Sequence, residues 1–173
     1  MIEALFAIAL IGGFFFLGNH RLTQLKKETE KPFSDFEGQA RIRRNLLKNL
    51  LEMELDVNSK YERVAAKIED LCNANTGGKI PFNNWIENEN LLTVALAELL
   101  PILNAMPYAE MPDNLIELQK KLQNNTRAFI QTAEIYNKAI VGYNHAVIMF
   151  PSNAFALIFN FRMRRPVVIP TMG

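Results

Sequence analysis

The side chains best suited to acid–base or metal chemistry are few and lie far apart in this sequence. There are two histidines, His20 and His145, and a single cysteine, Cys72. On the helix predicted around His145 the nearest acidic residue is Glu134, eleven positions away, whereas side chains that meet on a helix are three or four positions apart. A di-metal site in a bundle needs glutamate and histidine pairs at such spacings, and a cysteine-rich zinc site needs several thiols. We therefore predict no metal site, no cofactor and no enzymatic activity.

Composition excludes further classes of function. The chain has 173 residues, of which 49% are hydrophobic, enough for the core of one domain. The formal net charge of +1 provides no broad basic field, so we predict no nucleic-acid partner. A nucleophile elbow, a phosphate loop and a dinucleotide fingerprint are all absent from the sequence.

Residues 112–150 carry the longest periodic pattern and predict a helix that is packed along its whole length. An apolar column repeats every seven residues, and a second column, offset by three, is mostly small or polar. This 3–4 spacing is typical of a helix in a bundle or coiled coil. The first column consists of Leu115, Leu122, Phe129, Tyr136, Tyr143 and Phe150, and the second of Leu118, Asn125, Thr132, Ala139 and Ala146.

Two further long helices are predicted upstream. Residues 34–71 keep the 3–4 apolar spacing and predict one continuous helix after the boundary at Pro32. Residues 84–100 predict a shorter helix that Pro101 ends, and the glycine-containing stretch 73–81 predicts the turn between the two. The predicted fold is therefore all-α, an antiparallel bundle of three long helices with a short C-terminal helix.

A basic cluster lies near the start of the first long helix. It is most simply interpreted as a solvated helix face, with contact to lipid headgroups as the alternative. The cluster consists of Arg41, Arg43, Arg44 and Lys48.

Residues 2–18 form an apolar segment that predicts a single-pass transmembrane anchor. Its charge-free run of fifteen residues would span about 22–25 Å as a helix, against about 30 Å of hydrocarbon, so the bilayer must thin locally. The alternatives are a cleaved signal peptide and a buried core helix, but no basic region precedes the segment and no small-residue cleavage site follows it. The anchor residues are Leu5, Phe6, Ile8, Leu10, Ile11, Phe14, Phe15, Phe16 and Leu17.

Residues 19–33 predict a basic juxtamembrane linker. Glu3 is the only charged side chain ahead of the apolar run, whereas basic residues follow it directly, beginning with His20 and Arg21. Positive charge favours the cytoplasmic side of a membrane. We therefore predict a cell-membrane protein whose C-terminal body lies in the cytoplasm.

The C-terminal region combines a short apolar helix with a basic segment. Ser152 and Asn153 can cap a helix that is too short to span a bilayer, and residues 162–173 form a tail. One interpretation is a helix that lies on a membrane surface, and the other is a helix that folds back to plug the end of the bundle. The candidate membrane-surface residues are Phe155, Phe159, Phe161, Arg162, Arg164 and Arg165.

The end of the last long helix resembles the C-terminal signature of the LemA family. The matching residues are two Tyr-Asn pairs seven apart and a Phe-Pro-Ser-Asn sequence, namely Tyr136, Asn137, Tyr143, Asn144, Phe150, Pro151, Ser152 and Asn153. Residues 91–101 and 115–122 are similar to two other family stretches. The resemblance implies a membrane-anchored antiparallel helical bundle of bacterial type, here over residues 34–161, and it implies no reaction. The region between Cys72 and Leu91 is shorter than is usual in the family, which implies three helices in place of four.

The Tyr-Asn pairs have a structural interpretation and a functional one. Tyr136 and Tyr143 occupy inward positions, so their rings should pack while each hydroxyl finds a partner. Asn137 and Asn144 lie at the flank of that seam, where they can bond to a neighbouring helix and fix its register. The alternative is that both pairs line a binding groove.

These features predict a non-enzymatic interaction or scaffolding protein at the bacterial membrane. Its expected partners are the lipid bilayer, through residues 2–18, and another membrane or cytoplasmic protein, with a homo-oligomer as a further option. The alternative is a ligand- or lipid-binding bundle at the membrane surface, with an apolar cavity lined by Tyr136, Tyr143 and the C-terminal Phe-rich segment.

Overall fold

The computed structural model describes residues 2–53, 55, 59–75, 80–107 and 111–169, with side chains from residue 12 onward except at residue 14. Every regular element in this part of the chain is a helix. The helices are α1 (Ile2–Glu28), α2 (Glu30–Leu51), α3 (Ser59–Ala74), α4 (Phe82–Asn104), α5 (Asp113–Ile148) and α6 (Ser152–Ile158). The all-α prediction is confirmed.

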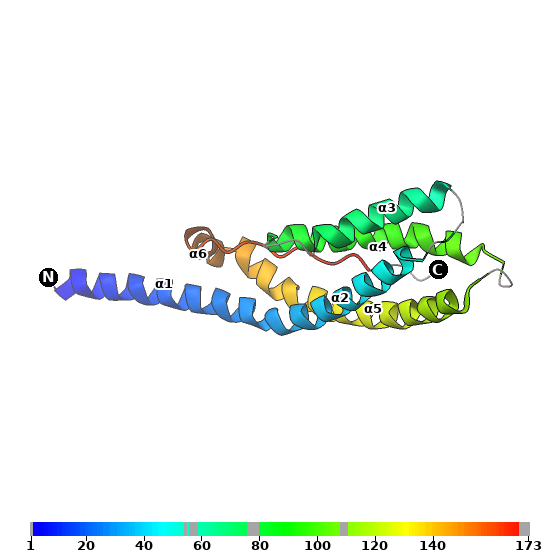
Figure 1. The fold of residues 1–173 in the computed structure, drawn as a ribbon. Helices are drawn as coiled ribbons and strands as arrows, with labels where there is room; N and C mark the ends of the chain where they lie inside the picture. Colours follow the sequence, from blue (N-terminus) through cyan, green and yellow to red (C-terminus); the bar gives the residue numbers. More distant parts are fainter. Residues whose placement is uncertain (1, 54, 56–58, 76–79, 108–110, 170–173) are drawn as a thin grey trace.

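The body is an antiparallel bundle of four helices, so the prediction of three long helices is wrong. In Figure 1, α2 and α4 run away from the end at which α1 enters, and α3 and α5 run back toward it. The error lies in residues 34–71, which were expected to form one helix, because α2 ends at Leu51 and α3 begins at Ser59. Both helices pack against one core, in which Leu47, Leu50, Tyr61 and Val64 are buried, so their apolar spacing continues across the turn.

Helices α1 and α2 form one long rod with a single interruption at Thr29 (Figure 1). The Thr29 side chain is buried, and its hydroxyl donates to the Lys26 carbonyl over 2.6 Å. Residues 19–28 are therefore helical, and α2 begins at Glu30 rather than after Pro32. Pro32 fits in the first turn of α2 because the amides there have no partner within the helix.

Prolines fall differently from expectation in α4 and α5. Pro101 lies inside α4, which continues to Asn104. It is tolerated in the last turn because only the carbonyl one turn earlier loses a partner. Pro112 is the residue before α5 rather than its first residue.

The first apolar column on α5 is confirmed from Leu115 to Tyr143, because every member of the column in that range is buried. Phe150 is the exception, because α5 ends two residues before it and 84% of its surface is exposed. On the second column, Leu118, Asn125 and Ala146 are buried, but in between the buried positions are Ala133 and Ile140 rather than Thr132 and Ala139. A straight helix has 3.6 residues per turn, so its inward face drifts by about 20° for each heptad.

Helix α6 packs against the base of α1 with one face and exposes the other. Phe155 is 3% exposed, and its ring meets that of Phe15 edge-on at 5.3 Å. Leu157 and Ile158 are 85% and 58% exposed. Phe155 is thus a plug residue and not a membrane-surface residue, because the apolar side that remains free is the opposite one.

No helix within the described side chains combines the length and apolarity that crossing a bilayer requires. Most of the predicted anchor lies outside that part of the chain, because the side chains of Leu5, Phe6, Ile8, Leu10, Ile11 and Phe14 are not described. The anchor therefore stays a prediction.

Candidate functional site

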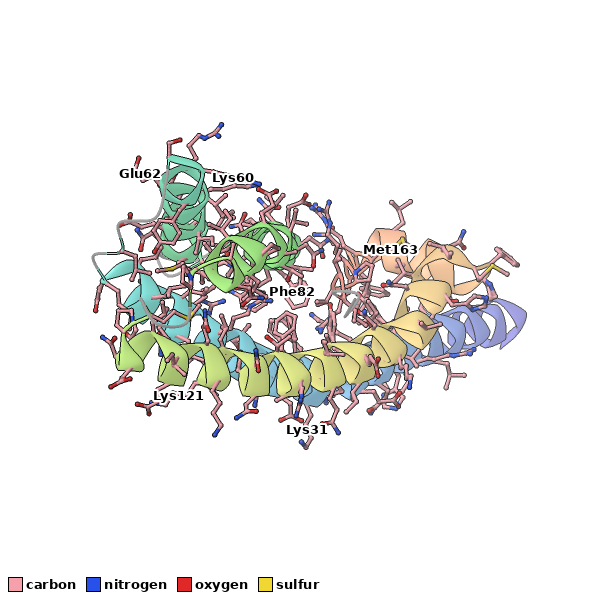
Figure 2. All side chains as sticks on the ribbon, turned by 90° about the vertical axis from the view of Figure 1, so that its right-hand side faces the viewer. Lys31, Lys60, Glu62, Phe82, Lys121 and Met163 are labelled. Atoms are coloured by element: carbon pink, nitrogen blue, oxygen red, sulfur yellow. The ribbon has the colours of Figure 1, made fainter. Side chains whose placement is uncertain are left out.

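The residues after α6 run back along the bundle in an extended course between α4 and α5 (Figure 1). We call residues 162–168 the tail segment. The groove that holds it is lined by two asparagines of each helix, Asn83 and Asn90 of α4 and Asn137 and Asn144 of α5, and we call it the asparagine groove. In Figure 2, Phe82 lies on the inner side of the body, near the asparagine groove, whereas charged side chains such as Lys121 point away from the body.

Each of the four asparagines binds the tail backbone with both ends of its amide. Asn137 accepts from the Val167 N–H and donates to the Val167 carbonyl, both over 2.8 Å. Asn144 does the same to Arg164 over 2.7 Å in each direction. A carboxamide carries one acceptor and a donor in the same plane, so each α5 asparagine pairs with a peptide residue as a neighbouring β-strand would.

The α4 asparagines bridge residues that are two apart in the tail. Asn83 donates to the Met163 carbonyl over 3.1 Å and accepts from the Arg165 N–H over 3.0 Å. Asn90 donates to the Pro166 carbonyl over 3.2 Å and accepts from the Val168 N–H over 2.8 Å.

The two tyrosines complete the backbone recognition. Tyr136 donates from its hydroxyl to the Arg165 carbonyl over 3.0 Å, and Tyr143 donates to the Arg162 carbonyl over 2.9 Å. Their rings belong to the core, where Tyr136 is fully buried and lies parallel to Phe36 at 5.9 Å. The space beside Tyr136 is thus filled by rings, which does not favour the apolar cavity of the ligand-binding alternative.

The spacing of the contacts matches two different periods. A step of seven residues along α4 or α5 corresponds to a step of three along the tail, because Asn144 binds residue 164 and Asn137 binds residue 167. Seven helical residues rise about 10.5 Å, and three extended residues span about 10 Å. A pair of heptad-spaced asparagines therefore holds an extended chain at every third residue.

Side chains of the tail add contacts beyond its backbone. Val167 is 4% exposed and joins the core cluster around Phe36 and Tyr136. The Arg164 guanidinium lies over the Phe82 ring at 4.8 Å, a favourable cation–π arrangement. Arg165 forms an ion pair with Glu87, and both side chains are 47% exposed. Arg164 and Arg165, expected to face lipid or solvent, are therefore engaged by the protein's own groove.

An open hollow of about 350 Å³ lies between α5 and the tail segment. Its walls are mainly apolar, and it borders the asparagine groove. The lining residues are Asn137, Ile140, Val141, Asn144, His145, Ile148 and Pro166.

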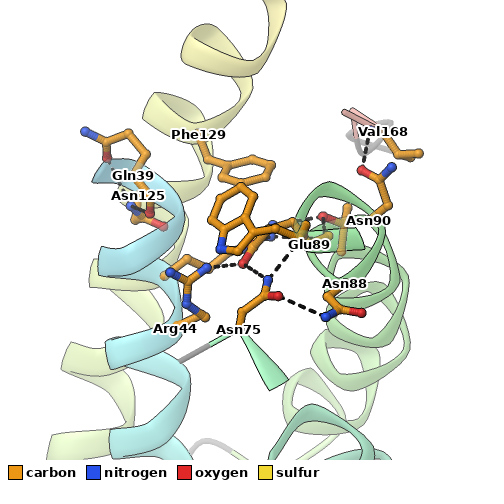
Figure 3. Close-up of polar contacts among 12 residues, drawn as sticks. Gln39, Arg44, Asn75, Asn88, Glu89, Asn90, Asn125, Phe129 and Val168 are labelled. Atoms are coloured by element: carbon orange, nitrogen blue, oxygen red, sulfur yellow. Dashed lines mark hydrogen bonds and ion pairs between the residues drawn. The ribbon is translucent and has the colours of Figure 1, made fainter. Parts of the chain in front are cut away.

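A second polar cluster is buried between α2, the end of α3 and α4 (Figure 3). Glu89 is fully buried, pairs with Arg43 over 2.7 Å and also pairs with Arg44. Asn75 donates to the same carboxylate over 2.8 Å, and Arg43 donates to Thr93 over 2.9 Å. Removal of one partner from such a buried pair is strongly destabilising, because it leaves an uncompensated buried charge. The solvated face expected for Arg43 and Arg44 is thus wrong, because both guanidiniums find their counter-charge on α4.

Burial displaces several pKa values near these sites. It raises the pKa of the Tyr136 phenol well above its usual range and raises that of Tyr143 as well, so both remain neutral hydrogen-bond donors at physiological pH. Burial lowers the pKa of the Arg43 guanidinium, an effect that Glu89 opposes. Burial also raises the pKa of the Cys72 thiol.

Only half of the predicted motif enters the site. Tyr136, Asn137, Tyr143 and Asn144 all bind the tail, whereas Phe150 and Pro151 lie in the turn after α5, and Ser152 and Asn153 begin α6. The Asn side chains bind the tail backbone rather than the neighbouring helix that was expected. Sequence reasoning missed Asn83, Asn90 and Glu89, although the seven-residue spacing of the two α4 asparagines repeats that of the α5 pair.

Ser152 and Asn153 were expected to cap α6, but Pro151 is the residue before it. The Ser152 hydroxyl donates to the Met149 carbonyl instead, over 3.1 Å. Helix α6 ends in a Schellman arrangement, in which Asn160 has a φ of 55° and the Phe161 N–H donates to the Ala156 carbonyl over 2.8 Å.

Comparison with known proteins adds one finding. A family model described as the LemA family matches residues 32–170, a range that contains α2 from Pro32 onward, α3 to α6 and the whole tail segment. No curated protein matches the chain.

Proposed function

The chain belongs to the LemA family, and from this premise we propose that it is a membrane-anchored, non-enzymatic interaction protein. Residues 2–18 hold it in the cell membrane, the body lies on the cytoplasmic side, and the rod and groove are presented to another membrane or cytoplasmic protein. The asparagine groove supports a binding role because its amides and phenols form neutral hydrogen bonds with a peptide backbone.

The observation that carries the proposal is an exposed apolar surface at the end of the body from which α1 emerges. Phe16 and Leu17 of α1 are 71% and 66% exposed, and α6, which carries the exposed Leu157 and Ile158, packs against α1 at the same end of the body. Phe150 in the adjoining turn is also exposed. Exposed apolar residues that gather on one surface mark a contact with lipid or protein, and we call this set the membrane-end patch: Phe16, Leu17, Phe150, Leu157 and Ile158.

The course of α1 supports the same orientation. It projects beyond α6 and away from the bundle (Figure 1). An added Cβ at Gly12 or Gly13 would meet nothing within 4 Å, so no helix of the described part of the chain packs against those two positions. Lipid would cover such a helix, with α6 lying at the level of the headgroups.

The proposal is tested with an environment-sensitive fluorophore in the full chain, reconstituted into vesicles of phosphatidylethanolamine and phosphatidylglycerol. The buried Cys72 is first replaced by alanine, and a nitrobenzoxadiazole label is placed at Leu157→Cys. The control label is at Lys120→Cys, an exposed position in the first part of α5. We expect a quencher attached to the lipid chains to quench the label at 157 and leave that at 120 unchanged. Equal quenching at both positions would contradict the proposed orientation.

The side of the membrane is tested separately. If the body is cytoplasmic, protease added to sealed cells leaves it intact and degrades it only after the cells are opened. Degradation of the body in sealed cells would place it on the outer side.

A further inference from the structure

The asparagine groove binds atoms that every peptide carries. Its four amides and two phenol hydroxyls form hydrogen bonds with backbone N–H and carbonyl groups of the tail segment. These bonds are therefore the same whether the occupant belongs to the same molecule or to another one. The N–H at position 166 is not required, since proline stands there.

The side-chain contacts nevertheless select one kind of occupant. Val167 enters the apolar core, which suits a β-branched aliphatic residue. Three positions earlier, the Arg164 guanidinium lies 4.8 Å from the ring centre of Phe82 and 5.8 Å from that of Tyr143. These two rings favour a cationic side chain at position 164. Arg165 adds an acidic partner, Glu87. A segment with a basic pair, a residue without an N–H and then valine fulfils these conditions, and the tail of another copy of this chain is such a segment.

The junction between α6 and the tail allows the tail to change direction. Asn160 is the one described non-glycine residue with a positive φ, 55°, and asparagine tolerates both left-handed and extended backbone. A change at this residue redirects the tail while α6 stays against α1. For the tail to reach a neighbour's groove, the C-terminal halves of the two α5 helices must lie close together.

The C-terminal half of α5 carries an exposed apolar surface. Val141 and Ile148, one heptad apart on α5, are 66% and 54% exposed and line the open hollow beside the tail. A second copy brought there by tail exchange would cover both, which adds buried apolar area to the exchanged backbone bonds.

We infer that this protein forms a tail-exchanged homodimer, in which the tail segment of each copy occupies the asparagine groove of the other. Exchange of an identical element keeps every contact between the tail segment and the groove, gives up the Schellman bond from Phe161 to Ala156 at the hinge, and gains the interface around Val141 and Ile148. The inference rests on the proposed role as an interaction protein and names a second copy as the partner.

The test is complementation between two full-length variants in detergent micelles. The groove variant carries Asn137→Ala and Asn144→Ala but keeps its tail, and the tail variant carries Val167→Asp but keeps its groove. In either variant alone no intact groove meets an intact tail, so the exchanged dimer loses four backbone bonds or the valine contact on each side, and the open monomer should predominate where the unmodified chain dimerises. An equimolar mixture should form a 1:1 heterodimer, measured by native mass spectrometry and by energy transfer between labelled copies.

Asn124→Ala is the matched control, because Asn124 lies on the exposed side of α5. It should dimerise as the unmodified chain does. Circular dichroism checks that both variants retain their helices. If either one unfolds, a synthetic peptide of residues 161–169 added to the unmodified chain replaces the test and should abolish energy transfer.

Two results would overturn the inference. One is a folded mixture that stays monomeric, or a peptide that leaves the energy transfer unchanged. The other is association that the groove variant alone retains in full, since the copies would then meet through a different surface. The vesicle experiment on Leu157 is independent of both results, so it can succeed where tail exchange fails.

Discussion

At the scale of single residues, an asparagine side chain acts here as a second peptide group. Asn137 gives both halves of its amide to one residue of the tail, which no other uncharged side chain of similar length except glutamine can do. The tyrosine before it points inward and uses only its hydroxyl on the tail. The Tyr-Asn pair therefore joins core packing and peptide recognition within two adjacent residues.

Glu89 and Glu87 lie two residues apart on α4 but should differ greatly in their effect on stability. Glu89→Gln leaves the buried Arg43 and Arg44 without a counter-charge, so the free energy of unfolding should fall by about 3–5 kcal/mol. Glu87→Gln removes an ion pair that is about half exposed, which should cost at most about 1 kcal/mol. Urea denaturation of both full-length variants in detergent measures the difference, and equal losses would show that the Glu89 cluster contributes little.

The phenol of Tyr136 makes stability depend on alkaline pH. Its pKa is raised in the folded protein, so above the unfolded value of about 10 the unfolded chain loses a proton that the folded chain keeps. The free energy of unfolding should therefore be independent of this group below about pH 10 and should fall above it, by at most about 1.4 kcal/mol per pH unit.

The comparison for this prediction is Tyr136→Phe, followed by urea denaturation between pH 8 and pH 11. The variant should be less stable at pH 8, because the Arg165 carbonyl loses its donor, but its stability should decline less steeply above pH 10. A slope identical to that of the unmodified chain would mean that Tyr136 titrates normally in the folded state.

At the scale of elements, the contact between α1 and α6 depends on the absence of a side chain at Gly18. A Cβ there would lie 2.7 Å from Cγ of Phe155 and closer still to the edge of the ring. The ring cannot easily yield, since Phe15 and the bundle end hold it on its other sides.

Gly18→Ala should therefore separate α6 from α1 and lower stability by about 1–3 kcal/mol. Gly38→Ala is the matched control, because a Cβ at this exposed position of α2 meets nothing within 4 Å. That control should raise stability by roughly 0.5–1 kcal/mol through the higher helix propensity of alanine. Thermal unfolding followed by circular dichroism should move in opposite directions for the two variants, and a neutral Gly18→Ala would show that α6 is loosely attached.

At the scale of the whole molecule, periodicity was enough to predict an all-helical bundle and most of the buried column on α5. It could not separate α2 from α3, because two antiparallel helices that pack on one core present the same apolar spacing as a single rod. Asp56, Asn58 and Ser59 are residue types that favour the start of a helix, and they were the available signal for the break.

The candidate site was predictable only in part. The Tyr-Asn pairs were found through their seven-residue repeat, but the tail that they bind has no periodicity of its own to reveal its place. The partner of Arg43 and Arg44, Glu89, lies more than forty positions along the chain, and no local pattern connects them. Contacts of this range depend on how the four helices assemble.

The match between heptad-spaced asparagines and every third tail residue has a mechanical consequence. A chain gripped in this way can be paired correctly only when it is advanced by whole triplets, because a slip of one or two residues leaves every amide facing the wrong atoms. The groove thus accepts a peptide only in registers about 10 Å apart. It therefore selects the register of a peptide as well as its side chains.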